Sequence, residues 1–210
     1  MPPRGYRSTT ETEIKRSRFL TTIARTDTEA EARALIAQIR CAHPNARHNC
    51  TAFILDDQGI RSARSSDDGE PAGTAGIPML TCLTGADLVN VTAVVTRYFG
   101  GIKLGAGGLT RAYGGCVADA VSSMPRMVRQ ELPVWIAEPT YADAGRIQEE
   151  LVRCGAGLID ISYTDTTVRL RFWSASDPIE DLARATQGAL VPRPDGVYVV
   201  EVPLEESHRA

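Results

Sequence analysis

The alternation of apolar and polar residues predicts a run of strands and helices in residues 1–131. Residues 11–24 are predicted to form a single strand. Residues 28–42 are predicted to form a helix, because Thr28 and Glu31 make a capping-box pattern at its start. The apolar positions of this helix recur at the spacing of one helix face: Ala32, Leu35, Ile36 and Ile39.

Strand and turn patterns continue to residue 131. Residues 49–55 and 60–65 predict a hairpin, because the four residues between them are typical of a turn. Residues 89–99 are rich in β-branched side chains, which indicates a buried strand. The remaining predictions are a loop at 66–76, a short helix at 77–83, a glycine loop at 100–108, a helix at 109–124 and a strand at 127–131.

The second part, residues 132–210, is predicted to hold its elements in the order βαββαβ. That order is the ferredoxin-like, split βαβ arrangement. Its strands are predicted at 133–138, 158–163, 167–173 and 197–202, and its helices at 141–153 and from Asp177 onward. Together the two parts predict an α+β protein of two domains, residues 1–131 and 132–210.

Charge supports this boundary. The first 131 residues hold 16 lysines and arginines against 13 acids, whereas residues 132–210 hold 7 against 13. The net charge of −3 is therefore unevenly spread, with the positive excess in the first part. Only two of the 23 basic residues are lysines, Lys15 and Lys103. A proteome-wide bias towards arginine would explain this, so the number of arginines alone does not indicate a function.

Composition excludes several classes of protein. With 43% hydrophobic and 23% charged residues, the 210-residue chain is neither disordered nor a coiled-coil rod. No stretch approaches the roughly 18 apolar residues of a membrane span, and no apolar segment follows the N-terminus as in a secretory signal. Five cysteines without a CxxC pair fit reduced thiols, so a cytoplasmic location without membrane contact is expected.

A glycine-rich segment between the strand at 89–99 and the following helix is the densest motif. Its glycines allow positive φ and close approach of a ligand to the backbone: Gly100, Gly101, Gly105, Gly107 and Gly108. Arg97, Lys103 and Arg111 flank these glycines, and a helix start beyond them favours an anion such as phosphate. Neither a Walker loop nor a complete GxGxxG is present. A purely structural glycine turn is the alternative.

Acidic residues gather in the loop before the helix at 77–83. Asp67, Asp68 and Glu70 could hold Mg²⁺ through oxygen ligands, although the EF-hand spacing is absent. Two alternatives remain: a solvated turn that caps the next helix, or ion pairs with the basic residues of the glycine segment.

Arg47, His48 and Cys50 form a third group. His48 could act as an acid–base group or ligand, or it could be a hydrogen-bonded structural histidine. Cys50 falls in an apparent strand, which favours a buried, inert thiol. In the second domain, alternating arginines precede Trp173 on one strand face, which is typical of base-stacking RNA-binding domains, of a solvated face or of a domain contact.

Taken together, three motifs resemble the YigZ/IMPACT family: residues 47–50, residues 65–76 and residues 97–105. The resemblance covers nearly the whole chain and is closest to the bacterial form with a small C-terminal domain. It implies a ribosomal-protein-S5 domain-2-like α/β fold for residues 1–131. For residues 132–210 it implies a ferredoxin-like fold similar to the last domain of elongation factor G. Eukaryotic relatives regulate translation through partners of an initiation-factor kinase pathway. They engage these partners partly through an additional N-terminal domain to which the resemblance does not extend, so we do not expect that particular role to carry over to this sequence.

The leading hypothesis is a translation-associated regulatory protein that binds RNA or the ribosome. Arg97, Lys103 and Arg111 would contact phosphate, and Arg47 and His48 would line the same groove. A second hypothesis is a metal-dependent hydrolase or phosphotransferase, in which Mg²⁺ sits on the acidic loop and His48 transfers a proton. A third is a protein-interaction module that docks through the acidic second domain to partners in translation control.

Overall fold

The computed structural model describes residues 1–57 and 59–204, and these residues form two compact units. Unit 1 comprises Met1–Met127 with Pro203 and Leu204, and unit 2 comprises Val128–Val202. Each unit has its own sheet, so the chain is a mixed α/β protein of two parts. The predicted turn at 56–59 includes Gln58, which lies outside the described residues.

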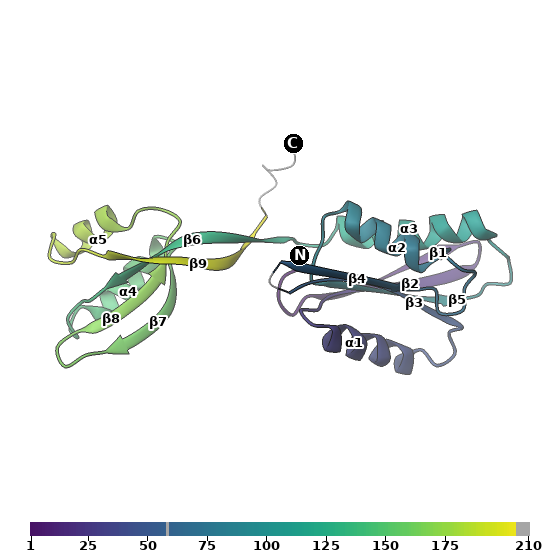
Figure 1. The fold of residues 1–210 in the computed structure, drawn as a ribbon, viewed down its shortest axis with the longest axis horizontal. Coiled ribbons are helices and arrows are strands. Elements are labelled where there is room, and N and C mark those ends of the chain that lie inside the picture. The colour runs from purple at the N-terminus through teal and green to yellow at the C-terminus, as the bar shows by residue number, and fades with distance from the viewer. Residues whose placement is uncertain (58, 205–210) are drawn as a thin grey trace. The chain divides into compact units, whose positions relative to one another are not determined.

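Unit 1 is built on a five-stranded sheet with the order β1-β2-β5-β3-β4 (Figure 1). Its strands are β1 (Arg7–Ile14), β2 (Ser17–Arg25), β3 (His48–Asp57), β4 (Ile60–Ser66) and β5 (Val91–Tyr98). All four neighbouring pairs are antiparallel. The predicted hairpin and the predicted buried strand are therefore both confirmed.

Helices cover both faces of this sheet (Figure 1). The helices α2 (Gly76–Gly85) and α3 (Ala106–Ser122) pack on one face, where side chains such as Phe19, Ala52 and Val95 form the main core. On the other face, α1 (Glu29–Ala42) buries Ala32 against Phe53 and Leu55. Because both faces are covered, β5 is buried almost throughout, its two threonines and Arg97 included.

The start of α1 is confirmed as predicted. The Thr28 side chain accepts a hydrogen bond from the Glu31 amide, and the Glu31 carboxylate accepts one from the Asp27 amide.

The single strand predicted at 11–24 is wrong. The chain reverses at Lys15 and Arg16, which have φ of 48° and 65°, and the two halves pair as β1 and β2 from Arg7↔Ala24 to Ile14↔Ser17. The error arose because neither residue of this two-residue turn is a glycine, asparagine or proline, so the usual turn signal is missing.

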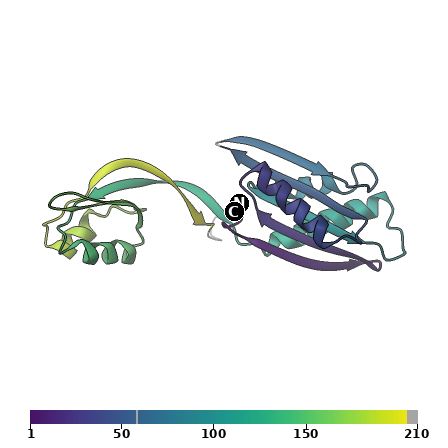
Figure 2. The same cartoon turned by 90° about the horizontal axis from the view of Figure 1, so that it is seen from below.

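Unit 2 has the predicted element order βαββαβ. Its elements are β6 (Met127–Ala137), α4 (Ala144–Arg153), β7 (Gly157–Tyr163), β8 (Val168–Trp173), α5 (Ile179–Thr186) and β9 (Arg193–Pro203). The strand order is β7-β8-β6-β9, and both helices lie on one side of this sheet (Figure 2). Ile147 of α4 and Leu182 of α5 share one buried cluster with Leu170 and Phe172 of β8.

Two strands predicted separately, at 127–131 and 133–138, form the single strand β6. Pro133 lies within β6, where we expected a break between the domains. The predicted boundary between residues 131 and 132 thus falls inside a strand, and the two units divide at Met127 and Val128 instead.

The arginine face of β8 carries ion pairs rather than free cations. Arg169 pairs with Glu138 at 2.7 Å, and Arg171 pairs with Asp195 at 2.6 Å. Trp173 lies against Gly157, where a Cβ atom would come within 2.2 Å of the indole ring. These contacts agree with the solvated-face alternative for this strand.

In the part of the chain that the structure describes, no helix has the length and apolar character needed to cross a bilayer.

Candidate nucleic-acid interface

Strand register brings the predicted motifs to one end of the first sheet. Arg97 near the end of β5 lies opposite His48 at the start of β3 and opposite Phe19 near the start of β2. The glycine segment follows β5, and the turn Lys15–Arg16 precedes β2. Motifs far apart in the sequence therefore meet at the same sheet end.

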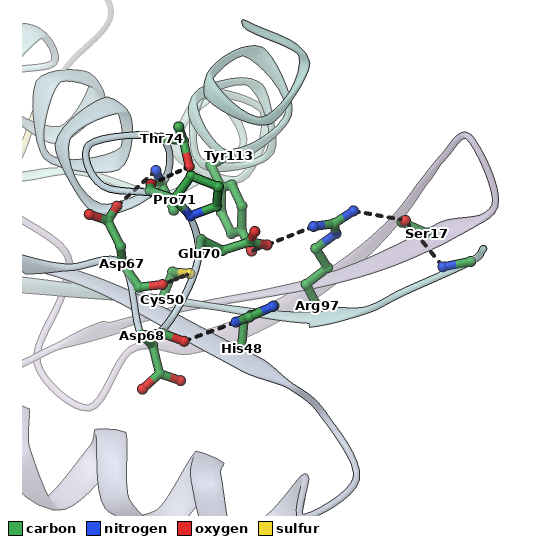
Figure 3. A network of polar contacts seen from close by, with 12 residues as sticks. Ser17, His48, Cys50, Asp67, Asp68, Glu70, Pro71, Thr74, Arg97 and Tyr113 are labelled. Carbon is green, nitrogen blue, oxygen red and sulfur yellow. Dashed lines mark hydrogen bonds and ion pairs between the residues drawn. The ribbon is translucent and has the colours of Figure 1, made fainter. Parts of the chain in front are cut away.

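A buried ion pair lies at the centre of this end (Figure 3). Arg97 Nη1 donates to Glu70 Oε1 at 2.7 Å, and the Tyr113 hydroxyl from α3 donates to the same oxygen at 2.7 Å. The side chains of Arg97 and Glu70 are only 7% and 4% exposed. Burial and its Cys50 and Glu70 neighbours raise the pKa of Tyr113, so its hydroxyl stays protonated and can keep donating.

Arg97, predicted as a direct phosphate contact, is turned inward. Its Nη2 donates to the Ser17 hydroxyl at 3.3 Å, and its guanidinium lies over the rings of Phe19 and Phe99. Arg97 therefore neutralises Glu70 and ties β2 to β5. This is the pairing alternative that the sequence left open, realised between Arg97 and Glu70.

The Asp67 carboxylate organises the loop that leads into α2. It accepts hydrogen bonds from the backbone amides of Gly73, Ala75 and Gly76 at 2.8 to 3.0 Å. Burial by itself raises the pKa of Asp67, but the three amides outweigh it and hold the pKa below the usual aspartate range. Asp67 is thus fixed as an ionised cap for this loop.

Asp68 and His48 form a separate set of contacts. The Asp68 carboxylate pairs with Arg40 at 2.6 Å and accepts from the Asn49 amide at 2.6 Å. His48 Nδ1 lies 2.9 Å from the Asp68 carbonyl oxygen, which can only accept, so Nδ1 carries the proton.

The three acids predicted as Mg²⁺ ligands do not point at one place (Figure 3). Asp67 faces backbone amides, Asp68 faces Arg40, and Glu70 faces Arg97. Over residues 1–57 and 59–204, no three His, Cys, Asp or Glu side chains are grouped so that they could hold a metal ion. The donor set at this loop therefore does not fit Mg²⁺.

Cys50 is a buried thiol, as its strand position predicts. Its Sγ donates to the Asp67 carbonyl at 3.0 Å, and burial raises its pKa to about 12. It is therefore protonated at neutral pH and is a poor nucleophile. All five cysteines are free.

The glycine segment contacts the turn between β1 and β2. A Cβ atom on Gly100 would lie 1.9 Å from the Arg16 carbonyl oxygen, so only glycine fits there. Gly105 has φ of +74° and precedes α3 as its N-cap, and no side chain caps this helix. Because an uncapped first turn has amides without helical partners, the segment presents N–H donors at its surface.

Exposed cations surround this segment. Lys15, Arg16, Arg47, Lys103 and Arg111 are exposed, and within the described residues none of them pairs with a carboxylate. Nearby Arg18, by contrast, pairs with Glu11 at 2.6 Å. We call these five side chains the cationic end. Both lysines of the chain belong to it.

A pocket of about 320 Å³ opens between the glycine segment and the buried ion pair. The residues that line it are Glu70, Pro71, Arg97, Phe99, Lys103, Leu104, Gly105, Ala106 and Leu109. Gly107 and Gly108 follow in the first turn of α3. The pocket thus combines apolar walls, one buried carboxylate and the amide donors at the start of a helix.

The sequence alone missed some residues of this end. Lys15 and Arg16 were hidden inside the predicted single strand, and two consecutive basic residues inside an alternating pattern were the available signal. Tyr113 was expected only as an apolar position on its helix, and nothing in its spacing indicates a bond to Glu70.

The five-stranded sheet of unit 1, with its glycine segment between β5 and α3, matches a known domain family. Residues 15–121, which lie within unit 1, match the family model of the Impact N-terminal domain. The chain therefore belongs to the IMPACT family, as its three motifs predicted.

Relatives extend over most of the chain. IMPACT family member YvyE from Bacillus subtilis is 41% identical over 155 residues, which cover 74% of this chain and 71% of that protein. IMPACT family member YigZ from Escherichia coli is 42% identical over 154 residues, which cover 72% and 74%. A crystal structure of a hypothetical protein matches with a TM-score of 0.56 and 36% identity, over 98% of this chain and 97% of that one.

Proposed function

We propose that this protein is a translation-associated regulator that binds RNA, free or within the ribosome, through the cationic end of unit 1. The observation that carries the proposal is the set of exposed cations around the glycine segment that pair with no carboxylate of residues 1–57 and 59–204. Other arginines of this unit, such as Arg33 and Arg61, are paired with carboxylates. Unpaired cations are the residues that neutralise phosphate.

The contacts are divided between side chains and backbone. Arg47, Lys103 and Arg111 act as phosphate contacts, joined by Lys15 and Arg16, and the amides at Gly105–Gly108 receive phosphate oxygens. His48 belongs to the groove wall beside Arg47. Arg97 serves as a positioning residue, because its bonds to Glu70 and Ser17 hold the segment in place.

Family membership supports the translation-associated part of the proposal, since eukaryotic members of the family regulate translation. Protein partners in that control and a cytoplasmic location belong to the same proposal. We also infer an S5 domain-2-like fold for unit 1 and a ferredoxin-like fold for unit 2. The strand order β7-β8-β6-β9, with both helices on one side, supports the second inference.

The salt dependence of RNA binding tests the cationic end. For a single-stranded RNA, the slope of log affinity against log salt should flatten by about 0.7 to 1 for each phosphate contact that is lost. Lys103→Ala should produce that change, and Lys15→Ala/Lys103→Ala about twice as much. Fluorescence anisotropy with a labelled oligonucleotide measures it.

Arg61→Ala/Arg64→Ala is the matched control, because it removes the same charge from paired, exposed arginines of the same unit. Equal slopes in the lysine variant, the control and the wild type would remove Lys15 and Lys103 from the interface.

A further inference from the structure

We infer that the pocket beside the glycine segment holds one nucleotide unit whose base presents an amino group to Glu70 and whose phosphate lies at the start of α3. This inference rests on the proposed function and names the chemistry that the site reads. The residues that would make the contacts are Glu70, Phe99, Lys103 and the amides of 106–108.

Glu70 supplies the first argument. Its carboxylate is 4% exposed yet lines the pocket, and both of its side-chain hydrogen bonds end on Oε1. Among the described residues Oε2 accepts no side-chain hydrogen bond, and it is not fully buried, so it is left as an acceptor within reach of solvent. Such an oxygen accepts a hydrogen bond from any donor that replaces solvent in the pocket. An amino group of cytosine, adenine or guanine supplies one, whereas uracil places a carbonyl at the equivalent position.

Charge at the other end of the pocket supplies the second argument. Lys103 is exposed there, and α3 begins with an uncapped turn of Ala106, Gly107 and Gly108. Amides at the start of a 17-residue helix favour an anion. Because Arg97 neutralises Glu70, the buried carboxylate does not repel that anion.

The walls supply the third argument. Pro71, Phe99, Leu104 and Leu109 make the pocket apolar between its two polar ends. The Phe99 ring is 47% exposed while the Arg97 guanidinium lies within 5.6 Å of its centroid. Unstacked bases of single-stranded RNA bind such aromatic side chains. A volume of about 320 Å³ is at the lower end of small-molecule pockets and suits a single nucleotide.

Amide NMR of the full chain with CMP and UMP tests the inference, because the two nucleotides differ at the group that faces Glu70. CMP should shift the amides of 106–108 and bind about tenfold more tightly than UMP. Cytidine, which lacks the phosphate, should bind more weakly than CMP. Equal binding of CMP and UMP, or no shift with either, would overturn the inference.

Phe99→Ala removes the stacking ring from a half-exposed position, so we expect a folded variant. CMP should bind it at least about fivefold more weakly, and Arg61→Ala should bind CMP as the wild type does. Glu70→Gln should reduce the preference for CMP over UMP. A Phe99→Ala variant with wild-type affinity would contradict the inference even if Glu70→Gln does not fold.

A short oligouridine separates this inference from the proposed function. Salt-sensitive binding of oligouridine without discrimination between CMP and UMP would overturn the pocket inference and leave the RNA surface in place. Preference for CMP over UMP without binding of any oligonucleotide would instead support a free-nucleotide site and contradict the RNA proposal. Binding of CMP together with oligocytidine preferred over oligouridine would support both.

Discussion

Replacing Glu70 by alanine is expected to lower the free energy of unfolding of unit 1 by about 3 to 5 kcal/mol. The change leaves the Arg97 guanidinium, 7% exposed, without its charge partner, and leaves the Tyr113 hydroxyl without an acceptor. A buried charge that loses its partner costs far more than a surface pair. Urea denaturation followed by far-UV circular dichroism measures the loss.

Trp135 and Trp173, the two tryptophans of the chain, both belong to unit 2, so their fluorescence reports that unit separately. The Glu70→Leu/Arg97→Met double variant should lose less stability than Glu70→Ala, because it removes both charges together. An unfolding midpoint of Glu70→Ala equal to that of the wild type would mean that the pair is not buried as described.

Gly100→Ala is expected to destabilise unit 1 by about 3 kcal/mol. The added methyl group would lie 1.9 Å from the Arg16 carbonyl oxygen and 2.6 Å from the Ser17 amide, both of which are backbone atoms. Backbone cannot rotate away as a side chain can, so either the β1–β2 turn or the glycine segment must move. Thermal unfolding together with amide NMR of the turn measures both effects.

Gly107→Ala is the matched control from the same segment. Nothing lies within 4 Å of the position that its Cβ atom would occupy, and its φ is not positive. Because alanine favours the helix, we expect stability to be unchanged or raised by up to about 1 kcal/mol. If Gly100→Ala were as stable as Gly107→Ala, the contact between the turn and the glycine segment would be refuted.

Capping patterns, side-chain propensities and apolar periodicity predicted the strands and helices well where apolar residues recur at a constant spacing. The helix after Thr28 and the buried strand before Tyr98 follow from capping and β-branched content. The turn at Lys15 and Arg16 was missed, because it holds none of the usual turn residues and its two basic residues with positive φ are held there by pairing across the hairpin. Pro133 led to a wrong prediction of two separate strands, because the proline is accommodated within the single strand β6.

The candidate site was predictable in its members but not in their roles. The sequence indicated that acids and arginines lie in loops of one region, but it did not tell which pairs form. The path of the loop between β4 and α2 decides that Arg97 faces Glu70, while Lys103 stays exposed. The carboxylates that suggested Mg²⁺ are divided among a loop cap, a surface ion pair and the buried pair. Which carboxylate pairs with which partner can be read only from the three-dimensional structure.

Ribosome co-sedimentation in a salt titration tests the central claim most directly. Wild-type protein is compared with Lys15→Ala/Lys103→Ala and with the control Arg61→Ala/Arg64→Ala, after all three are shown to be equally folded. The cationic end predicts that wild type and control sediment with ribosomes at low salt and are released as salt rises, and that the lysine variant is released at lower salt. Identical release of all three proteins, or no sedimentation at low salt, would contradict it.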